Sequence, residues 1–202
     1  ARLGFFDSLP SGIASLTVGE NNYARALVAQ SVPWQGGNVL YAVETAHNNG
    51  PWEQPERFHR GNAVLRYSTA TDNARTSITA MAYSAAWHST DQIPQRAIDQ
   101  GLVGRFGALD PSDGGSTERT SLSFQTERQS DKGTFKANAY AIASKLNLAS
   151  NFTYNLEQGE PPVNADQFVQ AESRQVLGAS ASQSFATSFS GFDNATTVGT
   201  SL

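Results

Sequence analysis

Extended segments in which apolar and polar residues alternate make up most of this chain. In Asn38–His47, for example, Val39, Tyr41 and Val43 fall on one side and Glu44 lies on the other. Because successive side chains of a β-strand point to opposite faces, a period of two indicates strands with one apolar and one polar face. No segment carries an apolar stripe at helical spacing over about three turns. The pattern therefore predicts an all-β fold.

The connections between the expected strands are long and short in turn. The long ones are polar and cover 48–60, 89–116 and 147–172, and the short ones cover 33–37, 69–74, 129–133 and 186–194. Strands that run up and down place every second connection at the same end of a sheet. We therefore expect an antiparallel up-and-down meander of about 9–10 strands that is part of a transmembrane β-barrel, since such barrels separate long outer loops from short inner turns.

Composition excludes several classes of protein. The net charge of −4 argues against a nucleic-acid partner, and the absence of cysteine excludes disulfides and thiolate metal sites. No run of about 20 apolar residues is present, so a membrane-spanning helix is excluded, whereas each strand of a membrane barrel needs only about 10 residues. The chain begins at Ala1 without a signal peptide, and Ala195–Leu202 has the pattern of an unfinished strand. We expect a fragment.

Several stretches carry a resemblance to a known family. They are Asn38–Trp52, Gly61–Ser68, Asp91–Arg96, Gly101–Gly115, Asn151–Tyr154 and Asp166–Phe168. In their amino-acid sequence and in their order along the chain they resemble TonB-dependent outer-membrane receptors. The resemblance is strongest in the long loop and covers most of residues 12–185.

The resemblance implies a 22-stranded barrel filled by an N-terminal plug. It also implies a place in the bacterial outer membrane, contact with lipid, and energy-coupled uptake of a siderophore, cobalamin or saccharide without chemical catalysis. No plug or TonB box is recognisable here, so TonB is expected as a partner only through a plug that this chain does not contain. We expect residues 1–11 to be a junction segment and residues 12–202 to be a partial barrel with unpaired edge strands.

Side chains of the long loops are candidates for contact with an extracellular small-molecule ligand. They are Gln92, Arg96, Arg105, Phe106, Trp52 and Tyr154. Arginines grip carboxylates and phosphates with paired donors, but Arg96 and Arg105 also have Asp91, Asp99 and Asp110 as internal partners.

Other aromatic and charged residues have two interpretations. Trp34, Trp52, Trp87 and Tyr154 fit the aromatic girdles of a membrane barrel, or are scattered core residues. Glu44, Arg66 and Lys136 are expected on the wet side of the sheet, paired across strands or touching a plug.

We expect neither a metal site nor a cofactor. His47, His59 and His88 lie near loop ends with no zinc spacing, and Asp110–Gly114 lacks the spacing and closing glutamate of an EF-hand. No nucleophile elbow or phosphate-binding loop is present, so the chain is not expected to be an enzyme.

Two alternatives remain open. One is a complete small outer-membrane barrel with a structural or adhesive role, which requires its first and last strands to pair. The other is a soluble secreted sugar-binding β-domain, which requires the apolar face to pack inside a sandwich.

Overall fold

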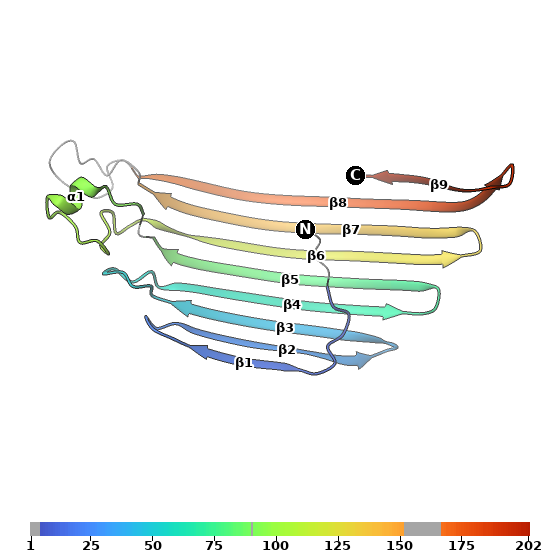
Figure 1. The fold of residues 1–202 in the computed structure, drawn as a ribbon, viewed down its shortest axis with the longest axis horizontal. Helices are drawn as coiled ribbons and strands as arrows, with labels where there is room; N and C mark the ends of the chain where they lie inside the picture. The colour runs from blue at the N-terminus through green and yellow to red at the C-terminus, as the bar shows by residue number, and fades with distance from the viewer. Residues whose placement is uncertain (1–4, 90, 152–166) are drawn as a thin grey trace.

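Nine β-strands form one antiparallel sheet in which the strands lie side by side in chain order (Figure 1). The structure is a computed structural model that describes residues 5–89, 91–151 and 167–202. The strands are β1 (Ile13–Val18), β2 (Ala24–Trp34), β3 (Gly37–Asn48), β4 (Phe58–Ala70), β5 (Ala74–His88), β6 (Gly114–Ser130), β7 (Gly133–Ser150), β8 (Phe168–Phe189) and β9 (Phe192–Ser201). A single short helix among the described residues, α1 (Gln95–Asp99), lies between β5 and β6. The expected all-β up-and-down meander is confirmed.

The register of the sheet is continuous, so alternate residues divide cleanly between two faces. Tyr41 lies opposite Leu65 in β3 and β4, and Leu40 lies opposite Arg66. The apolar face is defined by Val39, Tyr41, Val43, Leu65, Ile78, Leu122, Phe124, Phe135 and Leu177. The polar face is defined by Glu44, Arg66, Ser68, Thr79, Ser123, Gln125, Lys136 and Ser180. The faces expected from the alternation are therefore the faces observed.

The long and short connections lie at opposite ends of the sheet, as expected (Figure 1). The short-turn end holds the connections 35–36, 71–73, 131–132 and 190–191, and the long-loop end holds 19–23, 49–57, 89–113 and 151–167. The expected connection 186–194 was too long. Ser190 and Gly191 both have positive φ, which lets two residues close a hairpin and lets β8 and β9 extend into that range.

The sheet is open. β1 and β9 lie at opposite edges and do not pair with each other, and β9 pairs only with the Ser180–Phe189 half of β8. First-to-last pairing, which a complete small barrel needs, is absent from the described sheet, and no second sheet packs on it to form a sandwich. Among the described residues, no helix is long and apolar enough to cross a membrane.

A single sheet of this size leaves much of its surface uncovered. The chain exposes 13876 Å² at a mass of 21.6 kDa. A compact monomer of that mass exposes about 9,200 Å². The buried apolar side chains of the described residues are correspondingly few and mostly small: Ala29, Leu40, Ala46, Ala85 and Ala97. The sheet therefore leaves much of its area exposed and lacks the hydrophobic core of a self-contained domain.

The N-terminal segment Phe5–Gly12 crosses the sheet before β1 begins (Figure 1). Its backbone exchanges hydrogen bonds with a β2 side chain, from the Leu9 N–H to Ser31 Oγ at 2.8 Å and from that hydroxyl to the Leu9 carbonyl at 3.1 Å. Ser31 lies opposite Leu40 and so belongs to the polar face. The described part of the expected junction segment therefore lies against the polar face.

Candidate functional site

The apolar face is the larger of two candidate interaction surfaces. Its large side chains are exposed along the middle of the strands, with Leu65 54%, Leu122 55% and Leu177 77% accessible. Contiguous apolar patches beyond a few hundred Å² on a protein surface mark contacts with another protein or with lipid. The middle of this face is therefore the larger candidate for contact with an apolar partner.

On the polar face, side chains of neighbouring strands form a network of ion pairs and hydrogen bonds around Glu44. That carboxylate accepts from the Arg25 Nε at 2.7 Å and from the Asn62 Nδ2 at 3.1 Å, and Arg60 reaches its other side at 2.9 Å. The three partners come from β2 and β4, which flank β3. Cross-strand pairing is the arrangement that half-buried charges need. Of the two roles expected for Glu44, pairing across the sheet is the one observed.

Arg66 joins the polar face to the N-terminal segment. Its guanidinium is only 8% accessible as a residue and donates to Asp7 Oδ1 at 2.7 Å and 3.1 Å and to Thr79 Oγ1 at 2.7 Å. The ring of Phe5 covers the guanidinium carbon at 5.4 Å, a cation–π contact. Lys136 instead pairs along the face with Glu127 at 3.3 Å. Arg66 therefore contacts the expected junction segment, whereas Lys136 pairs across strands.

At the long-loop end, two of the expected ligand residues pack together. The rings of Trp52 and Phe106 lie 6.1 Å apart, and the Trp52 indole donates to the Glu56 carboxylate at 2.7 Å. A backbone hydrogen bond of 3.0 Å from Glu53 to Phe106 ties the same two loops. Trp52 thus belongs to a loop-to-loop contact, and Phe106 keeps half of its surface exposed.

The remaining ligand candidates are spread along the 89–113 loop. Gln92 precedes α1, Arg96 lies within it, and Arg105 follows it; all three are exposed. Neither arginine forms an ion pair with any described residue, so the internal pairing weighed for them is not observed there. Tyr154 lies outside the described residues.

The base of the long loops holds a buried polar cluster that sequence reasoning missed. Asp110 and Asp113 are each 2% accessible and Asn151 is 1% accessible. Asn151 Nδ2 donates to Asp110 Oδ2 at 3.0 Å, and Gln167 Nε2 donates to Asp113 Oδ1 at 3.0 Å. These contacts join the 89–113 loop to residues on either side of the 152–166 segment.

The surroundings of Asp113 disfavour the charged form of its carboxyl group. Burial raises the pKa of its carboxyl to about 6, the hydrogen bond from Gln167 opposes that rise, and the carboxylates of Asp110 and Asp91 add to it. A hydrogen bond between the Asp113 and Asp91 side chains also raises that pKa. Adjacent buried carboxyl groups disfavour simultaneous ionisation. The cluster is therefore a proton-sensitive contact between loops.

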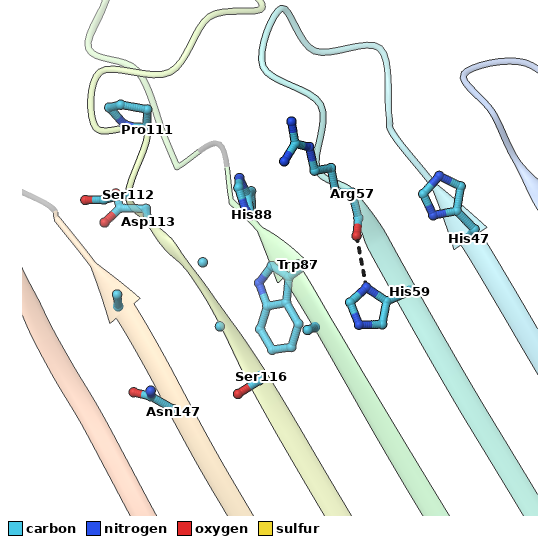
Figure 2. Close-up of a pocket in the computed structure, with 14 residues that line it drawn as sticks. His47, Arg57, His59, Trp87, His88, Pro111, Ser112, Asp113, Ser116 and Asn147 are labelled. Atoms are coloured by element: carbon cyan, nitrogen blue, oxygen red, sulfur yellow. Dashed lines mark hydrogen bonds between the residues drawn. The ribbon is translucent and has the colours of Figure 1, made fainter.

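The three histidines gather at the long-loop end of the apolar face. His47 lies directly opposite His59, and His88 follows Ala86, which is the partner of His59 in β5. Together with Arg57 they line a groove of about 720 Å³ (Figure 2). Within the part of the chain that the structure describes, no three metal-binding side chains are placed to hold a metal ion.

The aromatic residues expected at strand ends lie in different surroundings. Trp34, at the short-turn end, packs edge-on against Tyr67 of the apolar face at 5.5 Å. Trp87 lies opposite Gly115, two residues beyond Ala85, and the register places it on the polar face. Its side chain packs close to Gly115, where a Cβ atom would lie 3.2 Å from the indole.

Sequence signals existed for some of what was missed. His47 lies four residues after Val43 and His59 lies four residues before Ala63, and both references belong to the apolar face, so parity alone places the two histidines together. No such signal brings Asp113 to Gln167, because that contact depends on loop conformation.

No family model, no curated protein and no solved structure matches this chain.

Proposed function

We propose that this chain is a section of the barrel wall of a TonB-dependent outer-membrane receptor, which imports a scarce nutrient of the siderophore, cobalamin or saccharide class. The observation that carries the proposal is the two-faced open sheet. One face exposes large apolar side chains along the middle of the strands, and the other is lined with serines, threonines and paired ions.

Backbone and side-chain chemistry support a membrane location for such a sheet. In lipid every backbone polar group must be paired inside the protein, which antiparallel ladders achieve for all strands except those at an edge. The apolar face meets hydrocarbon in this arrangement, and the polar face meets a wet or plug-filled interior. Arg66 and Asp7 illustrate the second environment, because their ion pair holds the N-terminal segment against that face.

The long-loop end is the proposed extracellular end, where nutrient binds. Arg96 and Arg105 are exposed there without ion pairs to the described residues, and Phe106 offers an exposed ring beside Trp52. Cationic and aromatic groups on loops suit a large ligand that carries negative oxygens and flat surfaces. These residues act in binding, and no reaction is assigned to them.

The test is an uptake experiment in the bacterium that encodes the chain. The gene is deleted, and accumulation of ferric siderophores, cobalamin and oligosaccharides is measured with and without functional TonB. We expect deletion to abolish uptake of one class and loss of TonB to abolish the same uptake. Uptake that is unchanged by deletion, or that continues without TonB, contradicts the proposal.

A variant refines the ligand assignment. Replacing Arg96 and Arg105 together by glutamine is expected to lower the affinity for an anionic ligand about tenfold or more, because each charged hydrogen bond contributes about 1.5–3 kcal/mol. The control is Lys132→Gln at the short-turn end, which removes a positive charge far from the loops.

A further inference from the structure

A second surface at the long-loop end has a chemistry of its own. The groove of about 720 Å³ is lined by His47, Arg57, His59 and His88 on one side and by Ser116 and Asn147 on the other. Figure 2 shows these side chains along the ends of neighbouring strands. The register places His47 and His59 on the apolar face, and it places Ser116 and Asn147, on the other side of the groove, on the same face. Most of the strand residues that line the groove therefore belong to the apolar face, whereas Trp87 and Gly115 of its lining have the register of the polar face.

Donors of hydrogen bonds predominate on the β3–β4 side of the groove. His47 and His59 are direct cross-strand neighbours, which brings their Cβ atoms to about 4.5–5.5 Å. The His59 Nδ1 lies 3.2 Å from the Arg57 carbonyl oxygen, so this nitrogen carries the proton that it donates. The exposed Arg57 guanidinium forms no ion pair or hydrogen bond with the described residues. A planar fork of donors is thus free to receive an anion.

Acidic groups do not neutralise this side of the groove. Asp113 belongs to the opposite wall, is almost fully buried, and receives its hydrogen bond from Gln167. On the apolar face, Glu118 lies opposite Lys145, so those two charges balance. His88 is near Gln54, a neutral amide, at 3.4 Å. The groove therefore complements an anion on its β3–β4 side.

The position of the groove adds a second requirement. Val43, Ala63 and Ala82 continue the same face toward the middle of the sheet, and Val43 is 55% accessible. Between the histidines and these residues the same face carries one row of small or polar residues, Thr45, Gly61 and Ser84. The surface thus pairs an anion site with an apolar track that begins one row further along the strands.

We propose that this groove binds the phosphate group of a membrane lipid, with the acyl chains lying along the apolar face. Arginine binds phosphate with two parallel donors, and the ring of His47 offers an N–H donor beside it. The site lies where the apolar face ends and the loops begin, the level that lipid headgroups occupy on a barrel wall. The inference rests on the proposed membrane location and adds a specific lipid chemistry to it.

The experiment uses the chain in dodecyl maltoside micelles, which contain no phosphate. Phosphatidic acid or phosphatidylcholine is added, and the lipid phosphorus retained per chain is measured after gel filtration. We expect phosphatidic acid to be retained in preference to phosphatidylcholine. The triple variant His47→Gln, Arg57→Gln, His59→Gln is expected to lower that retention about tenfold. Arg57→Lys, which keeps the charge but loses the fork, is expected to give an intermediate value.

The matched control is Arg128→Gln. Arg128 is an exposed arginine of the same face at the short-turn end, and its removal changes net charge by the same amount as Arg57→Gln. Equal retention of phosphatidic acid by the wild type and the triple variant contradicts the proposal that the groove binds the lipid phosphate. Equal loss in Arg57→Gln and Arg128→Gln also overturns it, since general attraction to charge is then sufficient.

Further outcomes of this experiment distinguish a wrong lipid assignment or a wrong groove from a wrong membrane location. Binding of inorganic phosphate at the groove as tight as that of phosphatidic acid overturns the lipid assignment in favour of a soluble anion. Retention of neither lipid, together with dispersion of the chain without detergent, overturns the proposed membrane location as well. Retention of both lipids alike, unaffected by the variants, overturns the groove alone and leaves that location standing. Circular dichroism confirms the β content of each variant.

Discussion

The two faces of the sheet solve the problem of burial in opposite ways. On the polar face, charges find partners within the chain, as Glu44 does with Arg25 and Arg60 and as Arg66 does with Asp7. On the apolar face, leucines and valines from neighbouring strands stand exposed with nothing of the described chain above them. The difference teaches that the polar face pairs its charges within the described chain, whereas the apolar face leaves its large side chains uncovered.

Introducing a charge on each face gives the largest expected contrast. Leu122→Arg on the apolar face is expected to cost about 2–4 kcal/mol of unfolding free energy in a bilayer. Ser123→Arg, the adjacent residue on the polar face, is expected to cost less than about 1 kcal/mol, because it points to a wet interior. Urea unfolding in lipid vesicles measures both. Equal costs would break the comparison.

Removing the Arg66 contact tests how the polar face holds the N-terminal segment. Arg66→Met leaves Asp7 and Thr79 without their donors, and we expect a loss of about 1–3 kcal/mol, moderated because Asp7 is largely exposed. Hydrogen exchange of residues 5–12 should accelerate in this variant. Arg119→Met is the control, since Arg119 lies on the same face and forms no ion pair with any described residue. Unchanged exchange would contradict the contact.

The loop cluster is expected to make stability depend on pH. Burial raises the pKa of Asp113 from 3.8 to about 6, so the folded state holds this proton more tightly than the unfolded chain. Stability is therefore highest below pH 4 and falls as pH rises from about 4 to 6. Asp113→Asn should remove that slope and stabilise the chain by about 1–3 kcal/mol at pH 7.5, with no gain at pH 4. Thermal melts at both pH values measure it, and a gain at pH 4 equal to that at pH 7.5 would exclude titration as the cause.

The smallest expected effect concerns the aromatic pair at the short-turn end. Trp34 and Tyr67 meet edge-to-face, an arrangement that contributes about 0.5–1.5 kcal/mol beyond burial. A double-mutant cycle with Trp34→Leu and Tyr67→Leu isolates this coupling in unfolding experiments. A coupling energy of zero would show that the two rings act independently.

Most of the fold follows from local pattern. The alternation of Leu65, Arg66 and Tyr67 fixes which side chains share a face, and a register slip of one residue would reverse every assignment. Loop lengths then fix which end of the sheet each connection occupies. Strand ends were less predictable, because the positive φ of Ser190 and Gly191 that permits a tight hairpin is not visible in the apolar pattern.

The loop chemistry was predicted less well than the faces. Phe106 and Trp52 were singled out as ligand residues, but their mutual packing arises from a contact between loops far apart in sequence. The burial of Asp110 and Asn151 depends on the same kind of contact. Residues in irregular segments are positioned by tertiary contacts, which no period in the sequence encodes.

The most direct measurement of the central claim is the accessibility of single spin labels along β3. The chain has no cysteine, so a cysteine can be placed at each position from Val39 to Glu44 in turn. In lipid vesicles, labels at Val39, Tyr41 and Val43 should collide with oxygen dissolved in the bilayer. Labels at the alternate positions should be shielded from oxygen and reached, if at all, by a water-soluble nickel complex. Equal accessibility of both sets to the nickel complex would contradict a sheet that faces hydrocarbon on one side.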